Sequence, residues 1–316
     1  MKSIALAALL LPTAAAAQLS IDEINGADPL SGEDRAAMIR LQVLLDRSGA
    51  SVGYVDGYMG EATRAALRAF EAMNGMTVDG ELDPELWAVL EQGGPATETY
   101  TLTEEDAGFE ATPEIPEDYE KMAEMDHLGY HSHQEMLAER FQMDPELLAE
   151  LNPEADFTAA GTEITVAATR VAPEGEVMRI TVNRDTGRLE AFDGTGEDGK
   201  LIFAAPAAVG SQQTPSPSGS MKVTAIAADP TYTYDPENLP NADFDEVVQI
   251  AAGPNGPVGS MWIDLGKPTY GIHGTPYPTE ITSMASHGCV RLTNWDAEHL
   301  AQLVKPGETV VEFTGG

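Results

Sequence analysis

Apolar residues recur at helical spacing in the first part of the chain. The stretch 34–47 places its leucines on one face of a helix with about 3.6 residues per turn. A second amphipathic stretch, EATRAALRAFEAMNG, ends at Gly75, a residue type that commonly ends helices. A short third helix is expected around 84–90. These segments predict a small all-α domain of three helices within residues 18–91.

The helical periodicity is lost over residues 92–130, where Gly, Pro, Thr and Glu predominate. Such a composition predicts a linker or insert, although the letters TYTLT within it are compatible with the start of a strand. Residues 131–170 then predict a helix, a turn at Asp144-Pro145, a second short helix and a strand. We therefore expect a small α+β module after the linker.

From about residue 173, segments typical of β-strands alternate with Gly- and Pro-rich loops. The segment RITVNRDTGRLEAF predicts a β-hairpin that turns at the letters DTG. One helix is expected, over 295–304, with Thr293 or Asn294 as its N-cap. Residues 173–314 are therefore expected to form a mostly β domain with one C-terminal helix. Further strands are expected in KLIFAAPAAVG, SMKVTAIA, SMWIDL, YGIHG and ETVVEF.

The first residues have the layout of a secretory leader. Lys2 precedes an apolar run over 4–11, and small residues lead to an Ala17/Gln18 junction of the A-x-A type. The run is shorter than the roughly 20 residues that a spanning helix needs, and no later segment is long and apolar enough. We expect residues 1–17 to be a signal peptide. The mature protein is then expected to be periplasmic and soluble, without a membrane span.

Composition narrows the classes of partner. The chain has 52 Asp and Glu against 17 Lys and Arg, a formal net charge of -35. A surface of this charge repels polyanions, so neither nucleic acid nor anionic lipid is an expected partner. With 316 residues and 42% hydrophobic content, the chain is long enough for two or three domains, each with a core of its own.

Two short strings, YGIHGTP and SHGCVRL, carry the candidate chemistry. The second holds Cys289, the single cysteine of the chain, which cannot form an internal disulfide. A cysteine nucleophile needs a base that takes its proton and donors that stabilise an oxyanion. His273 is the candidate base, and a carbonyl near Gly274 can orient its ring. Gly288 allows a turn that leaves backbone amides free for an oxyanion.

Other interpretations of these residues stay open. Cys289 can be a buried, inert thiol, or it can join two chains through a disulfide. His273, His287 and Cys289 also form an acceptable zinc ligand set, although no fourth ligand is evident. His131 and His133 lie two positions apart, but no third ligand is nearby, so we interpret them as surface residues. No metal and no other cofactor is expected.

Two segments resemble modules that bind the bacterial cell wall. The spacing D-G-x-x-G-x-x-T-x-x-A-L-x-x-F, within about 35–91, resembles the helical peptidoglycan-binding domain; the alternative is a generic three-helix bundle. The letters LLAELNP followed by GTEITV, within 131–170, resemble the second half of a LysM wall-binding module. The residues of the first pattern are Asp56, Gly57, Gly60, Thr63, Ala66, Leu67 and Phe70.

IHGT followed by SHGCVRL resembles the signature of the L,D-transpeptidase catalytic domain of the YkuD type. The order of segments over 173–314 also follows that family. The resemblance implies that Cys289 is the acylated nucleophile and His273 the general base, with the carbonyl of Gly274 orienting its ring. The spacer departs from the family pattern, because the glycine expected after Ile281 is missing.

The resemblance implies roles for the neighbouring residues as well. An oxyanion hole is implied for the backbone amides of His287, Gly288 and Cys289. Substrate binding is implied for Ser286, Arg291 and Tyr270, with the Arg291 guanidinium available for a substrate carboxylate.

The activity of this family sets the expected function. Its members attack the amide after the third residue, a diamino acid, of a peptidoglycan tetrapeptide stem and release D-Ala. The acyl group then passes to an amine of another stem and forms a 3-3 cross-link. We therefore expect a periplasmic cysteine L,D-transpeptidase whose partner is peptidoglycan. The alternatives are an L,D-carboxypeptidase or endopeptidase, a transferase that attaches an outer-membrane protein to the wall, and a non-catalytic wall-binding scaffold.

Overall fold

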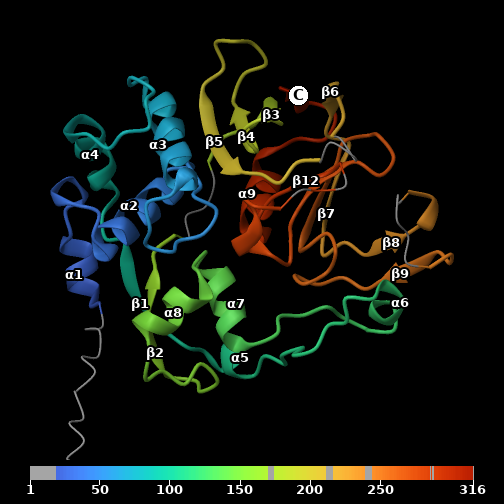
Figure 1. The fold of residues 1–316 in the computed structure, drawn as a ribbon, viewed down its shortest axis with the longest axis horizontal. Helices are drawn as coiled ribbons and strands as arrows, with labels where there is room; N and C mark the ends of the chain where they lie inside the picture. Colours follow the sequence, from blue (N-terminus) through green and yellow to red (C-terminus); the bar gives the residue numbers. More distant parts are fainter. Residues whose placement is uncertain are drawn as a thin grey trace, which may run out of the picture.

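The computed structural model describes residues 19–169, 174–210, 216–238, 244–284, 286 and 288–315. Helices gather at the N-terminal end and β-sheets make up the C-terminal half, and a long green segment runs between the two (Figure 1). The expected signal peptide, residues 1–17, lies outside the described residues. Among the residues that are described, no helix has the length and apolar character to cross a membrane.

The N-terminal domain consists of short helices with well-defined ends. The side chain of Asp34 caps the second helix by accepting a hydrogen bond from the Ala37 amide. Gly75 adopts φ 67°, the left-handed conformation that ends the third helix. The three helices expected from the sequence are confirmed. The elements are α1 Ile21–Gly26, α2 Arg35–Arg47, α3 Glu61–Asn74 and α4 Pro84–Leu90, with 3₁₀ turns η1 Pro29–Ser31 and η2 Glu91–Gly93.

A middle unit with the order strand, helix, helix, strand follows. Its strands β1 Thr97–Thr101 and β2 Glu163–Ala167 pair in antiparallel fashion. Helices α7 His133–Arg140 and α8 Pro145–Leu151 lie between them in the chain. Asn152 ties this part together, because its side chain donates to Thr165 O at 2.8 Å and accepts from Thr165 N at 2.6 Å. The unit therefore begins at β1, within the segment that the sequence analysis assigned to a linker.

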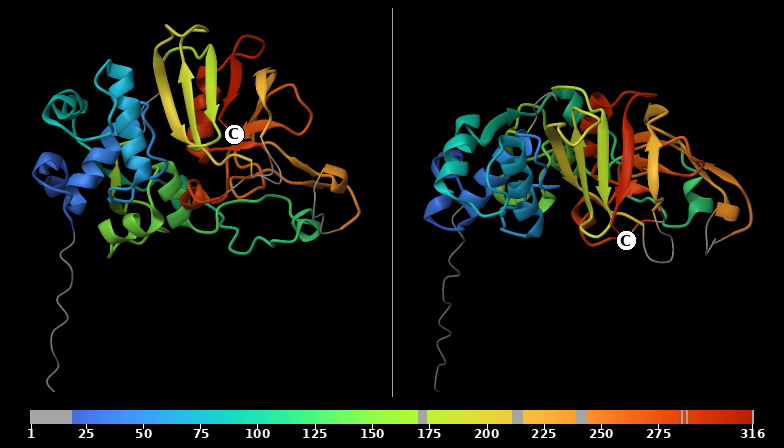
Figure 2. Two further views of the ribbon diagram at one scale, coloured as in Figure 1. Left: turned by 45° about the horizontal axis from the view of Figure 1, so that its top comes forward. Right: turned by 90° about the horizontal axis from the view of Figure 1, so that it is seen from above.

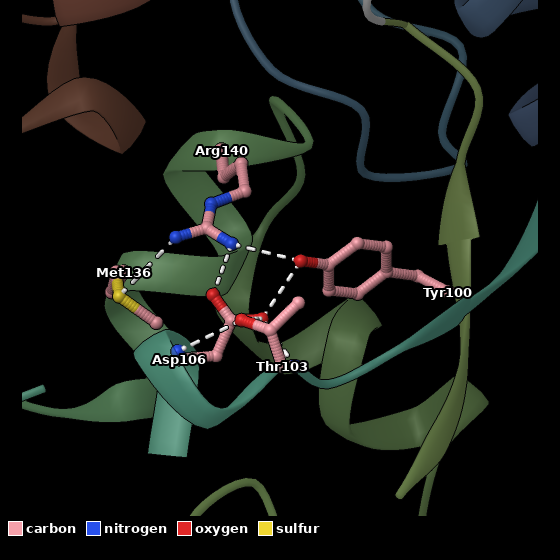
Figure 3. A network of polar contacts seen from close by, with 5 residues as sticks. All are labelled: Tyr100, Thr103, Asp106, Met136 and Arg140. Atoms are coloured by element: carbon pink, nitrogen blue, oxygen red, sulfur yellow. Dashed lines mark hydrogen bonds and ion pairs between the residues drawn. The ribbon is translucent and has the colours of Figure 1, made fainter. Parts of the chain in front are cut away.

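The rest of the expected linker, between β1 and α7, is also structured. It contains α5 Glu104–Ala107 and α6 Tyr119–Met122. The side chain of Asp106 in α5 accepts from Tyr100 of β1 at 2.7 Å and pairs with Arg140 of α7 (Figure 3). Beyond α5 the chain leaves the middle unit and reaches the C-terminal half, where α6 lies beside a β-hairpin (Figures 1 and 2). Composition did not predict this packing, because the segment contributes few apolar residues to the contact with the hairpin.

The C-terminal domain contains a five-stranded sheet in the order β5-β4-β3-β13-β6 and a four-stranded sheet in the order β12-β11-β10-β7. A separate hairpin, β8–β9, projects from it, and helix α9 Asn294–Leu303 packs into its core. The mostly β domain with a C-terminal helix is confirmed. The strands are β3 Arg179–Asn183, β4 Arg188–Phe192, β5 Leu201–Pro206, β6 Gly219–Lys222, β7 Ala225–Ala228, β8 Tyr232–Tyr234, β9 Val248–Ile250, β10 Met261–Asp264, β11 Gly271–His273, β12 Val290–Arg291 and β13 Val310–Thr314, with 3₁₀ turns η3 Pro236–Asn238 and η4 Pro278–Glu280.

The segment SMKVTAIA, expected as one strand, is two strands in different sheets. The chain changes sheets at Val223 and Thr224. The Val223 amide donates to Thr309 O at 3.0 Å, and the Thr224 amide donates to Asp264 O at 2.8 Å. Consecutive residues therefore bond to different sheets, which a pattern of apolar residues cannot reveal.

The helical domain and the middle unit share one core, contrary to the expectation that each domain has its own. Leu44 of α2 and Leu147 of α8 belong to the same buried cluster as Ala204 of β5. Units of this size bury too little apolar surface alone, and packing together removes more of it from water. The helical domain is also bonded to the start of α9, where Ser51 Oγ donates to Asp296 Oδ2 at 3.0 Å.

Candidate active site

The site is built on two neighbouring parallel strands, β11 and β12. In their register, Ile272 pairs with Val290, and His273 pairs with Arg291. Side chains alternate between the faces of a strand, so His273 and Gly271 share one face of β11. A side chain at Gly271 would meet the Trp262 ring at 2.5 Å, so glycine leaves the room that this ring occupies.

A cavity of about 620 Å³ opens over these strands. Cys289 and His273, which are 16 residues apart in the chain, both line it. The expected nucleophile and base are thus brought to one cavity. The lining of this cavity also includes Tyr119, Tyr232, Trp262, Thr269, Tyr270 and Arg291.

The His273 ring is held in one orientation. Its Nδ1 lies 2.7 Å from the carbonyl oxygen of Gly274. A carbonyl oxygen can only accept, so Nδ1 carries the proton and Nε2 has a free lone pair. The ring is 3% exposed and stacks on Trp262 with centroids 5.5 Å apart. Burial, and then the charge of Arg291, lower the pKa of His273 to about 3, so the imidazole is neutral.

The Cys289 thiol is half-buried and faces a backbone carbonyl. Its Sγ donates to Thr269 O at 3.2 Å. Burial raises the pKa of the thiol, against the lowering effects of the Gly271 backbone and the Arg291 charge. The resting site therefore pairs a thiol with a neutral imidazole. Thr269 has φ 69°, a conformation that costs a β-branched residue roughly 1–3 kcal/mol, so the carbonyl facing Sγ sits on strained backbone.

Asn294 lies against Gly274, the residue whose carbonyl orients His273. A side chain at Gly274 would meet Asn294 Oδ1 at 2.1 Å, so the peptide lies directly on this amide. Asn294 Oδ1 accepts from the Ser260 amide at 3.1 Å. Its Nδ2 donates to Glu139 Oε2 at 2.9 Å and to Pro254 O at 3.1 Å. The N-cap of α9 is Thr293, which leaves Asn294 free for this supporting position.

The turn before the cysteine differs from expectation in one respect. Gly288 has φ 118°, which suits glycine, but its amide donates to Ser286 Oγ at 3.1 Å. That amide is therefore occupied and is not directed at an oxyanion. Ser286 is buried, and its hydroxyl also donates to Cys289 O, so it shapes the turn and is not among the cavity-lining residues. His287 lies outside the described residues.

Arg291 and Tyr270 are placed as expected for contacts with a ligand. Both line the cavity that contains Cys289. Within the described parts of the chain, no ion pair joins Arg291 to an acidic side chain, so its charge is available to a carboxylate. Lys267 Nζ lies 4.2 Å from the centre of the Tyr270 ring. Arg291 also lines a second cavity of about 280 Å³, together with Tyr119 and Met122 of α6.

Comparison with known protein families agrees with this geometry. Residues 178–312 match the L,D-transpeptidase catalytic domain of the YkuD family. The chain carries an L,D-transpeptidase catalytic domain. Residues 34–90 match the peptidoglycan-binding domain family, so the N-terminal helices of the chain are a peptidoglycan-binding domain. The LysM-like resemblance of residues 131–170 has no counterpart among these matches and stays a prediction.

Several relatives of this L,D-transpeptidase domain bear names from the same family. YkuD of Bacillus licheniformis, named as an L,D-transpeptidase, is 29% identical over 178 residues, which are 56% of this chain and 90% of that protein. YbiS of Escherichia coli K12, also named as one, is 29% identical over 188 residues, 57% of this chain and 59% of YbiS. The solved L,D-transpeptidase 3 of Mycobacterium tuberculosis superposes with a TM-score of 0.34 at 16% identity, covering 49% of this chain and 76% of that one.

Sequence reasoning missed two residues of the L,D-transpeptidase site. The sequence around Asn294 indicates only a possible helix cap. Tyr119 lies in the segment expected to be a linker, outside the matched domain, yet it lines the cavity of Cys289. A signal for it was present, because Tyr119 and Met122 have helical spacing and follow Asp118, a residue type that commonly caps helices.

Proposed function

We propose that this L,D-transpeptidase acts on peptidoglycan tetrapeptide stems through a thioester at Cys289 and forms 3-3 cross-links. One observation carries the proposal: Cys289 and His273 line one cavity, and the bond from His273 Nδ1 to Gly274 O leaves Nε2 as a base. A non-catalytic scaffold has no need of this arrangement.

In the acylation step, His273 Nε2 takes the proton of the Cys289 thiol. The sulfur attacks the carbonyl carbon of the third residue of the donor stem, the carbon that is bonded to the nitrogen of D-Ala. The backbone amide of Cys289 is the proposed donor to the oxyanion, because the amide of Gly288 is occupied. The amide C–N bond then breaks, the proton on Nε2 passes to the leaving nitrogen, and D-Ala departs. The stem remains as a thioester.

In the transfer step, the amine of a second stem attacks the thioester carbon. Its proton passes to His273 Nε2, the C–S bond breaks, and the proton returns to the sulfur. The charge of Arg291 is proposed to hold a carboxylate of the stem beside the cysteine. At rest the His273 imidazole and the Cys289 thiol are both neutral. The reaction therefore begins and ends without a net charge on this pair.

The remaining parts of the chain support action at the cell wall. The peptidoglycan-binding domain, residues 34–90, is proposed to hold the enzyme on its substrate. The strand–helix–helix–strand order of the middle unit supports a second, LysM-like contact with the wall. The leader expected at residues 1–17 supports a periplasmic location.

Mass spectrometry of products tests the proposal. Protein lacking residues 1–17 is incubated with disaccharide-tetrapeptide, beside a Cys289→Ala variant. Loss of D-Ala and a 3-3 dimer, both absent with the variant, are the expected results. Tripeptide without dimer would assign a hydrolase instead. An untouched substrate would contradict the proposal, and would favour the scaffold or an enzyme that attaches a protein to the wall.

A further inference from the structure

The chain between α5 and α7 forms an arm, defined here as residues 111–129, that both begins and ends in the middle unit. At its base, the Thr112 amide donates to Tyr130 O at 2.8 Å. Near its C-terminal end it bonds to the catalytic domain: the Leu128 amide donates to Ala252 O at 3.0 Å, and the Asn255 amide donates to Leu128 O at 3.1 Å. A side chain at Gly253 would meet Leu128 O at 2.1 Å, so glycine there permits the close approach.

The arm is packed against the β8–β9 hairpin by aromatic and aliphatic side chains. The Tyr119 ring centre lies 5.1 Å from that of Tyr234 and 6.0 Å from that of Tyr232. Leu128, Tyr234 and Ile250 form the fully buried centre of this contact. Figures 1 and 2 both place α6 beside β8 and β9. The contact holds the arm in a defined position relative to the catalytic domain.

In that position Tyr119 lines the same cavity as Cys289. Of the described arm residues, Tyr119 is the one that lines the cavity of Cys289, and it also lines the smaller second cavity. Tyr232, whose ring centre lies 6.0 Å from that of Tyr119, lines the cavity of Cys289 as well. The arm therefore completes a wall of the cavity with a side chain from outside the matched domain of 178–312.

We propose that Tyr119 is a specificity-determining residue that contacts the donor peptide stem in the cavity of Cys289. The proposal rests on the proposed function for the identity of the ligand. Whatever the acceptor is, the atoms nearest the sulfur during acylation are those of the stem whose amide is cleaved. A cavity of about 620 Å³ is of a size to enclose a few peptide residues but not the attached disaccharide as well. A tyrosine ring offers a flat apolar face to aliphatic side chains and a hydroxyl to the peptide backbone.

Protection of the Cys289 thiol reports binding in this cavity and needs no turnover. Cys289 is alkylated with iodoacetamide in the presence of the stem tripeptide, the product that remains after D-Ala is released. The tripeptide concentration that halves the alkylation rate is measured, each variant being compared with its own rate without peptide. The wall-binding units do not affect this readout, because they contain no cysteine.

Tyr119→Ala is expected to raise the half-protecting concentration about tenfold, a usual loss for an aromatic contact. The control is Met125→Ala, because Met125 packs in the same cluster but is not among the residues that line either cavity. Met125→Ala is expected to change the value by less than about twofold. Tyr119→Phe keeps the ring and is expected to retain most of the protection.

Three results would overturn the proposal: no effect of Tyr119→Ala, an equal effect of Met125→Ala, or no protection of the unaltered protein by millimolar tripeptide. An equal effect of Met125→Ala would mean that the arm only supports the hairpin. Protection that depends on Tyr119, without any release of D-Ala from tetrapeptide, would uphold this inference while refuting the transpeptidase reaction.

Discussion

Asn294 donates its Nδ2 proton to the buried carboxyl of Glu139 at 2.9 Å, and its Oδ1 lies against the peptide of Gly274. Glu139 belongs to α7 of the middle unit, whereas Gly274 carries the carbonyl that orients His273. A residue outside the matched catalytic domain is thus three contacts away from the proposed base. The middle unit therefore contributes a contact that helps to position the site.

Glu139→Gln is expected to change how stability depends on pH. Burial raises the pKa of Glu139 to about 8 from 4.5. Between those values the folded protein holds a proton that the unfolded chain has released, so this group's contribution to stability falls as pH rises. Glutamine cannot ionise and still accepts from Asn294. Urea unfolding from about pH 5 to 8 should show a variant that loses less stability, by roughly 1–3 kcal/mol.

The matched control for that experiment is Glu98→Gln, which makes the same substitution at an exposed position on β1. Its unfolding free energy should run parallel to that of the unaltered protein across the same pH range. Parallel curves for Glu139→Gln as well would show that this carboxyl is ionised in the folded protein.

Alkylation of Cys289 is expected to accelerate only in alkaline solution. Burial raises the pKa of the thiol above its usual 9.0, and His273 is neutral across the ordinary range. The rate with iodoacetamide should therefore climb with pH and reach no plateau at or below neutrality. A plateau below about pH 7 would instead indicate a thiolate–imidazolium pair.

Arg291→Gln gives a second check on the same titration. The charge of Arg291 lowers the pKa of the Cys289 thiol, so its removal should move the alkylation profile to still higher pH. Arg64→Gln removes a partly exposed charge on α3 and serves as the control, with no displacement expected. Equal pH profiles of alkylation for all three proteins would show that the charge of Arg291 does not affect the pKa of the Cys289 thiol.

Gly274→Ala is expected to reduce activity by two orders of magnitude or more, on the scale of roughly 10²-fold for a small misplacement at a reacting group. The added methyl would meet Asn294 Oδ1 at 2.1 Å, so the peptide that orients His273 must move. Gly26→Ala is the control, because a side chain there meets nothing within 4 Å. D-Ala release is the measurement, and near-normal release from Gly274→Ala would show that the orienting carbonyl is dispensable.

Asp106→Asn is expected to destabilise the middle unit. Burial alone raises the pKa of Asp106, but hydrogen bonds from Thr103, Tyr100 and Arg140 outweigh it and hold the pKa well below its usual value (Figure 3). This stabilisation is present above the unfolded pKa and is lost as pH falls. At neutral pH the variant should unfold about 1–3 kcal/mol more easily in urea. The difference should shrink in acid; a constant difference would point to packing and not to charge.

Features that depend on nearby residues were predictable from the sequence. The helices α2, α3 and α4 follow from apolar spacing, with Asp34 as a cap and Gly75 as a stop. The two short strings made Cys289 and His273 candidates, because a thiol, an imidazole and a glycine turn lie within a short span, and both residues line one cavity. Such features are determined by contacts between residues close in the chain, and local patterns report them.

Features that join distant segments were decided by tertiary structure alone. The pairing of β1 with β2 spans more than sixty positions, and Asn294 meets Glu139 across 155 positions of the chain. Tyr119 reaches the cavity of Cys289 only because the arm packs on a hairpin that the pattern did not reveal. The sequence predicts a free amide at Gly288, whereas in the structure this amide donates to Ser286 Oγ. Local patterns specify which residues carry chemistry and which segments fold, whereas burial and long-range packing determine which of them meet.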